Sequence, residues 1–137
     1  MEPMLSPLGA PCIRPPWGTL LAIDLEKGER LWEVPLGSTR DVAPFPLWLD
    51  WGVPNMGGSL LTASGLVFIG ATTDNFLRAF DVKTGQELWK ARLPGGGQAT
   101  PMSYRLSKDG KQYVVIAAGG HKYLGTDVSD ALVAYAL

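Results

Sequence analysis

Residues 78–90 read RAFDVKTGQELWK, and residues 21–33 read LAIDLEKGERLWE. Four residues of the segment 21–33 recur 57 residues later in the segment 78–90. The pairs are Ala22 and Ala79, Asp24 and Asp81, Gly28 and Gly85, and Trp32 and Trp89. Because every pair keeps the same offset, the match is a register and not a similarity of composition. An internal repeat of roughly this length is typical of arrays and propellers, in which each copy builds one structural unit.

The residues around both copies predict short strands separated by tight turns. Strands at 20–25 and 31–36 flank a turn at 26–28, where Gly28 can adopt a positive φ. Runs rich in β-branched and aromatic residues, bounded by Gly, Asp and Asn, predict seven more strands at 59–63, 66–72, 76–82, 87–93, 99–105, 112–119 and 131–137. No stretch keeps a helical period. The predicted class is all-β.

The order of these strands predicts a partial β-propeller. If a blade has four strands, A to D from the centre outward, the chain reads C–D, then A–B–C–D, then A–B–C. This order divides the chain into an extended N-terminal segment at 1–14 and a partial propeller at 15–137. The propeller part holds a blade end at 18–36, a full blade at 58–93 and a blade start at 98–137. Its open edges must pair with the rest of a parent propeller or with other copies of the chain.

Composition excludes several classes of function. The 137 residues are 46% hydrophobic and 18% charged, which is typical of a globular protein. A net charge of −1 gives no electrostatic basis for binding nucleic acid. The single cysteine, Cys12, excludes an internal disulfide, and no pair of Cys or His has zinc-site spacing. Three consecutive glycines at 95–97 precede no helix, so they do not predict a phosphate loop.

One uncharged stretch, 51–73, is long enough to cross a bilayer. Its glycines, hydroxyl residues and Pro54 favour two strands around a turn instead of a transmembrane helix. No basic segment followed by an apolar core begins the chain, so no signal peptide is predicted.

The repeated tryptophans have two interpretations. Trp32 and Trp89 can wedge between neighbouring sheets, with each indole bonding to a backbone carbonyl, or they can form a surface that stacks on a cofactor. Their equal spacing from Gly28 and Gly85 favours the structural docking role, because repeat proteins reuse the same contact between neighbouring units.

The repeat A-x-D-x-x-x-G-x-x-x-W resembles the tryptophan-docking motif of quinoprotein dehydrogenase propellers. Three longer segments narrow the resemblance: GSTRDVAPFP at 37–46, WGVPNMGGSLLTASGLVFIGATTDN at 51–75, and LPGGGQATPMSYRLSKDGKQYVVIAAGGHKYLGT at 93–126. From about residue 11 to residue 137 the chain is similar to the C-terminal part of the membrane-bound glucose, quinate and polyol dehydrogenases that use pyrroloquinoline quinone (PQQ).

This resemblance implies an eight-bladed propeller on the periplasmic side of the inner membrane, with PQQ and calcium or magnesium on its axis. An aspartate base takes the proton of a sugar or polyol hydroxyl, and the electrons pass to ubiquinone. The base and most metal ligands of the family lie in other blades. The resemblance therefore implies no catalytic residue and no metal ligand in this chain, and we expect the isolated chain to be inactive.

Five residues match family positions near the cofactor. His121, the only histidine, ends the AAGGH segment, and Asp74 lies in TTDN. Asn55, Gly57 and Gly58 match a stretch that lines the propeller centre, where glycine lets the backbone approach a planar ring. The structural alternatives are a solvated loop histidine and an aspartate that only forms a turn. After His121 the family has small residues where this chain has Lys122 and Tyr123.

Two other functional classes fit the same sequence. The chain can be a non-catalytic propeller-like module that assembles through its open sheet edges, or an interaction scaffold with unused docking repeats. The AAGGH and PGGGQATPM segments argue against the scaffold, because a scaffold does not need them. Nothing in the sequence places a serine, the histidine and an aspartate together as a hydrolytic triad.

Overall fold

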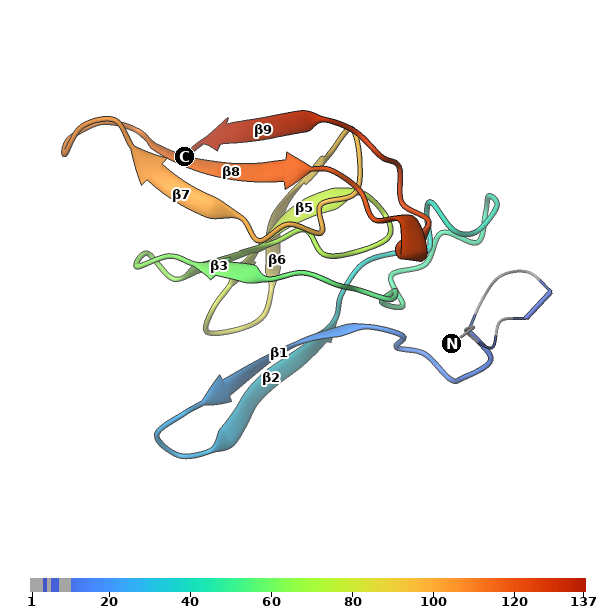
Figure 1. Cartoon of the computed structure of the whole chain (residues 1–137). Helices are drawn as coiled ribbons and strands as arrows, with labels where there is room; N and C mark the ends of the chain where they lie inside the picture. The colour runs from blue at the N-terminus through green and yellow to red at the C-terminus, as the bar shows by residue number, and fades with distance from the viewer. Residues whose placement is uncertain (1–3, 5, 8–10) are drawn as a thin grey trace.

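The computed structural model describes residues 4, 6–7 and 11–137. Within these residues nine strands and one short 3₁₀ helix follow one another (Figure 1): β1 (Thr19–Asp24), β2 (Glu29–Pro35), β3 (Ser59–Leu61), β4 (Leu66–Ile69), β5 (Phe76–Asp81), β6 (Glu87–Arg92), β7 (Met102–Arg105), β8 (Gln112–Ala118), η1 (Lys122–Leu124) and β9 (Ala131–Ala136). The all-β prediction is confirmed, and η1 is the one element that the sequence did not predict. The predicted extended segment at 1–14 lies partly outside the described residues and stays a prediction.

The strands form three antiparallel sheets, in the orders β1-β2, β3-β4-β5-β6 and β7-β8-β9. The sheets have two, four and three strands, and the division into a blade end, a full blade and a blade start stays a prediction. The pairing of β1 with β2 shifts register between Ala22 and Ile23, and the pairing of β5 with β6 shifts between Ala79 and Phe80. The two bulges occupy equivalent positions of the sequence repeat, so the repeat extends to the backbone geometry.

The inner strands of the middle sheet, β4 and β5, are buried on both faces, because their side chains alternate between two neighbours. Towards the first sheet, a core cluster contains Leu36, Val67, Ile69, Ala71 and Phe80. Towards the third sheet, a second cluster contains Phe68, Leu77, Ala79, Leu93, Val114, Ile116 and Ala118. The uncharged stretch at 51–73 thus supplies β3, β4 and core residues of a sheet. No helix in the described part of the chain is long and apolar enough to span a membrane.

The first and third sheets bury only one face each. On the outer side of the first sheet, Leu21, Ile23 and Leu31 are exposed. On the third sheet, Met102 and Leu132 are exposed. Each end of the stack therefore presents an apolar sheet face that nothing within the described residues covers.

The two repeated tryptophans make different contacts. Trp32 Nε1 donates a hydrogen bond to the Val82 carbonyl at 2.9 Å, and its ring lies against Gly85, where a Cβ would come within 2.7 Å of ring carbons. Trp32 thus joins the first sheet to the turn between β5 and β6. Trp89 packs edge-on against Tyr135 of the third sheet, with ring centroids 5.0 Å apart, and its indole N–H bonds to nothing in the described ranges.

Candidate functional site

All five predicted cofactor residues lie on connections at one end of the sheets. In an antiparallel sheet, alternate connections lie at the same end, so the loops after β2, β4, β6 and β8 meet there. We refer to these loops, 36–58, 70–75, 93–101 and 119–130, as the loop face. Backbone hydrogen bonds join them: Met56 to Ala71 at 2.8 Å, Ala71 to Gly97 at 2.7 Å and Gly96 to Asp127 at 2.9 Å. In Figure 1 η1 marks this end, opposite the β1–β2 and β7–β8 turns.

Asp74 is completely buried and fully hydrogen-bonded. Arg78, which is 2% exposed, donates to both carboxylate oxygens. Thr72 Oγ1 donates at 2.6 Å, and Ser38 donates from its backbone N–H at 2.7 Å and from its hydroxyl at 2.8 Å. Burial alone raises the pKa of this carboxyl, but the Arg78 guanidinium and the hydrogen bonds outweigh burial and hold the pKa below its ordinary value.

This arrangement gives Asp74 a structural task. Its carboxylate ties the 70–75 loop to the segment after β2, across 36 positions of sequence. The predicted role of Asp74 in shaping a quinone pocket stays a prediction. Because all its hydrogen bonds are internal, Asp74 would act in such a pocket by holding the 70–75 loop in place. The sequence analysis missed Arg78. Its signal was an arginine inside the apolar run FLRAF of β5.

The lowered pKa predicts how stability depends on pH. A group whose folded pKa lies below its unfolded value, here 3.8, stabilises the fold above that value, and the contribution disappears as pH falls through the folded pKa. We expect the free energy of unfolding of the wild type to fall more steeply below about pH 4 than that of Asp74→Asn. Urea titrations of both proteins between neutral and acidic pH measure the difference. Parallel profiles would contradict an ionised Asp74 in the folded state.

His121 lies at the start of the η1 turn and is half-buried. Its backbone N–H donates to Thr126 Oγ1 at 2.7 Å, and its ring centroid lies 5.8 Å from that of Tyr123. Its Nδ1 atom is buried and has no hydrogen-bond partner in the described ranges. The imidazole is therefore close to the surface of the loop face with one ring nitrogen unsatisfied.

Asn55, Gly57 and Gly58 lie where two loops pack against each other. Asn55 forms an isolated β-bridge with Thr72. A Cβ on Gly57 would come within 2.6 Å of the Gln98 carbonyl oxygen, and one on Gly58 within 2.2 Å of Thr100 Oγ1. Internal packing between the 36–58 and 93–101 loops therefore already requires these glycines. Their predicted contact with a cofactor stays a prediction.

The unsatisfied polar atoms of the loop face test whether a quinone cofactor fits here. Three buried side-chain atoms of the described residues have no partner: Thr73 Oγ1, Asn75 Oδ1 and His121 Nδ1. PQQ presents carboxylate and carbonyl oxygens, which need donors, and a hydroxyl and an imidazole N–H can supply them. Within residues 4, 6–7 and 11–137, no group of three His, Cys, Asp or Glu side chains could hold a metal ion. The described residues can therefore donate hydrogen bonds to such a cofactor, but they do not form a ligand set for its metal ion.

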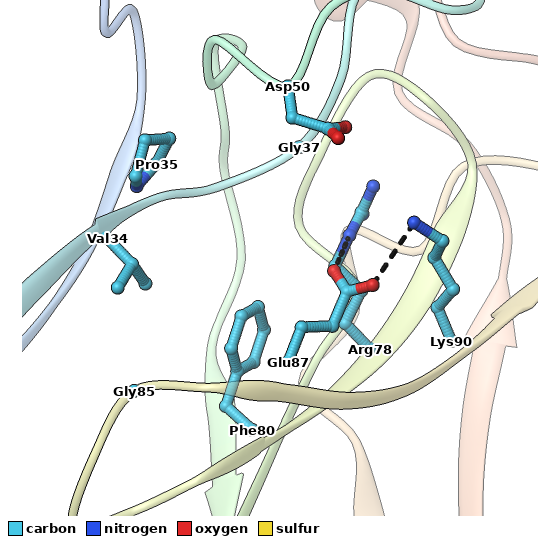
Figure 2. A pocket seen from close by; sticks show the side chains of 9 residues that line it. All are labelled: Val34, Pro35, Gly37, Asp50, Arg78, Phe80, Gly85, Glu87 and Lys90. Carbon is cyan, nitrogen blue, oxygen red and sulfur yellow. Dashed lines mark hydrogen bonds and ion pairs between the residues drawn. The ribbon is translucent and has the colours of Figure 1, made fainter.

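A cleft of about 270 Å³ lies between β2 and the β5–β6 hairpin. Arg78, which forms the buried ion pair with Asp74, lines it together with Glu87, Lys90 and Asp50. Figure 2 shows the Glu87 carboxylate between Arg78 and Lys90, with Asp50 across the cleft. Glu87 accepts from Arg78 Nε and from Lys90 Nζ, both at 3.1 Å. Arg78 thus bonds Asp74 on the inside and Glu87 at the cleft, so the site and the cleft share one guanidinium.

Comparison with known proteins identifies the relatives of the chain. The profile of the PQQ glucose, ethanol and alcohol dehydrogenase β-propeller domain matches residues 1–114. The chain is 48% identical to quinoprotein glucose dehydrogenase of Escherichia coli (strain K12), over 100% of this chain and 18% of that protein. It is 54% identical to quinoprotein glucose dehydrogenase A of Acinetobacter calcoaceticus, over 97% of this chain and 17% of that protein. It is 53% identical to the glycerol dehydrogenase large subunit of Gluconobacter thailandicus, over 94% of this chain and 18% of that protein.

Solved structures show the same architecture. The quinohemoprotein alcohol dehydrogenase from Comamonas testosteroni superimposes with a TM-score of 0.56 at 33% identity, over 80% of this chain and 14% of that one. A europium-containing methanol dehydrogenase superimposes with a TM-score of 0.55 at 31% identity, over 74% of this chain and 15% of that one. The chain thus spans less than a fifth of the length of these relatives.

Proposed function

This chain belongs to the PQQ glucose, ethanol and alcohol dehydrogenase propeller family, and from that premise we propose that it forms part of a dehydrogenase that oxidises a sugar or polyol hydroxyl. The observation that carries the proposal is the high identity, over nearly the whole chain, to glucose and glycerol dehydrogenases. A further relative, at 49% identity, is the quinate/shikimate dehydrogenase (quinone) of Acinetobacter baylyi. All these names describe oxidation of an alcohol carbon. A quinone, ubiquinone in this proposal, receives the electrons.

The proposal assigns this chain one wall of the cofactor site. PQQ, with calcium or magnesium, supplies the two-electron acceptor when it is bound in the complete propeller. On the loop face, His121 and Thr73 are the groups that donate hydrogen bonds, and Asp74 holds the loop that carries Thr73. The catalytic base and the metal ligands come from blades outside this chain. We place the complete protein on the periplasmic side of the inner membrane.

A binding titration tests this function. The purified chain is titrated with PQQ in the presence of calcium or magnesium, and quenching of its five tryptophans is followed. We expect saturable binding, weakened about tenfold in His121→Ala, because a hydrogen bond to a charged group is lost. Lys108→Ala, in the turn between β7 and β8, is the control and should bind like the wild type. Equal affinity of His121→Ala and wild type would remove His121 from the site.

Self-assembly through open sheet edges is the second candidate function. The exposed apolar faces of the first and third sheets favour it, because Leu21 and Ile23 at one end and Met102 and Leu132 at the other need cover. In this case the chain is a non-catalytic propeller-like module whose partner is another copy of itself. Light scattering over a wide concentration range distinguishes the two, since only the module forms defined oligomers. A strict monomer argues for a parent propeller as the partner.

A further inference from the structure

We propose that Gln98 and Thr126 are positioning residues that hold His121 on the loop face, an inference that rests on the proposed quinone-binding function. A line of hydrogen bonds runs through these side chains from one loop to another. Gln98 Nε2 donates to the Thr72 carbonyl at 3.1 Å, and Thr126 Oγ1 donates to Gln98 Oε1 at 3.2 Å. The same Thr126 oxygen accepts the His121 backbone N–H at 2.7 Å. We refer to this line as the Gln98–Thr126 relay.

The relay links the two loops that carry unsatisfied donors. Thr73 lies in the 70–75 loop next to Thr72, and His121 lies in the 119–130 loop. A second bond, from Asn75 Nδ2 to Asp127 Oδ2 at 2.9 Å, joins the same two loops. The loop from β6 to β7 passes between them and contributes Gln98. The two donor-bearing loops are therefore joined by side-chain hydrogen bonds, and by backbone hydrogen bonds to the 93–101 loop, and not by a shared strand.

Gly96, the middle one of three consecutive glycines at 95–97, makes room for the relay. A Cβ on Gly96 would come within 2.2 Å of Gln98 Oε1 and within 2.4 Å of Thr126 Oγ1. The Gly96 backbone also bonds to both sides, donating to the Asp127 carbonyl at 2.9 Å and accepting from Gly120 N–H at 2.8 Å. The glycine run thus has a packing function that its sequence alone did not indicate.

Apart from the Leu124 N–H, which donates to the His121 carbonyl at 3.0 Å, the relay supplies the hydrogen bonding that holds His121. Within the described residues its imidazole makes no hydrogen bond, and its ring neighbour Tyr123 is 92% exposed. The turn that follows is only three residues long. Thr126, by contrast, is buried at 7% exposure, so its hydroxyl has a defined position. Loss of that hydroxyl leaves the His121 N–H without its acceptor and Gln98 Oε1 without a donor.

The single histidine makes a direct test possible. In protein labelled with ¹⁵N-histidine, only His121 contributes imidazole signals. We expect Thr126→Val to shift or broaden the wild-type signals, and Thr126→Ser, which restores a hydroxyl, to recover them. The dissociation constant for PQQ with calcium should rise about threefold to tenfold in Thr126→Val and return in Thr126→Ser.

Thr62→Val is the matched control. Thr62 is also buried, and its hydroxyl bonds to the Leu66 carbonyl at 3.1 Å in the turn between β3 and β4, at the other end of the sheet. This variant should lose a comparable hydrogen bond without changing the imidazole signals or the affinity for PQQ. Gln98→Met serves as a second relay variant if Thr126→Val does not fold, and it should produce the same changes.

The two proposals fail separately. Absence of PQQ binding by the wild type removes the proposed function, while the imidazole signals still report on the relay. Unchanged imidazole signals in a folded Thr126→Val or Gln98→Met protein overturn the positioning role, whether or not the affinity for PQQ changes. Failure of both variants to fold also overturns it, because the relay would then be required for the fold and not for the placement of His121.

Discussion

Replacing Arg78 with methionine is expected to lower the free energy of unfolding by about 3–5 kcal/mol, because it leaves the buried Asp74 carboxylate without its partner. Both side chains are almost completely shielded from water, so solvent cannot replace the guanidinium. The hydroxyls of Thr72 and Ser38 would remain as donors, but they carry no positive charge. The interaction of Arg78 with Glu87 contributes less, because Glu87 is one-third exposed.

Urea unfolding followed by tryptophan fluorescence measures this loss. The informative control is the double variant Arg78→Met with Asp74→Asn, in which the uncompensated charge is gone. Because the cost of the single variant is mainly that of the stranded carboxylate, the double variant should be more stable than Arg78→Met alone. If the single variant loses less than about 1 kcal/mol, the ion pair is solvated and the structure of this loop is different.

Alanine at Gly85 is expected to destabilise the chain by about 2–5 kcal/mol, whereas alanine at Gly28 should cost only about 1–2 kcal/mol. The two glycines occupy the same position of the repeat and have similar left-handed conformations, with φ of +67° and +72°. Both substitutions therefore carry the same backbone strain. Only at Gly85 would the new methyl group collide with the Trp32 ring, while at Gly28 nothing lies within 4 Å.

The difference between the two variants isolates the docking contact. Equilibrium unfolding of both variants, compared with wild type, gives the two losses in free energy directly. Combining Gly85→Ala with Trp32→Ala should remove the steric part of the cost, since the ring is then absent. Equal losses at Gly28 and Gly85 would show that the Trp32 ring does not rest on this turn.

Most of the fold could be predicted because its determinants are local. All nine strands lie within the predicted ranges or within two residues of them, since alternation of side chains and turn glycines depends on neighbours in sequence. The bulges after Ala22 and Ala79 were not predicted, although they occupy equivalent positions of the repeat. The η1 turn was missed because three residues are too few to establish a helical period.

The candidate site could be predicted only in part. The sequence located the loops that carry His121, Asp74 and Asn55, and the structure brings those loops together at one end of the sheets. It did not indicate the partners of these residues. Arg78 is marked only by its place in an apolar run. Gln98 and Thr126 are not distinguished by any local pattern, because their roles depend on contacts across 26 and 28 positions of sequence.

The sequence by itself determined the number, order and turn chemistry of the strands, and hence the propeller class. Only the tertiary structure decided which of two equivalent tryptophans is docked, since Trp32 meets a carbonyl 50 positions away and Trp89 meets a tyrosine ring instead. It likewise decided that Asp74 is neutralised by Arg78. The physical reason is the same in both cases. A buried polar group must be satisfied by whatever the packed sheets bring beside it, and that neighbour is not encoded next to it in the chain.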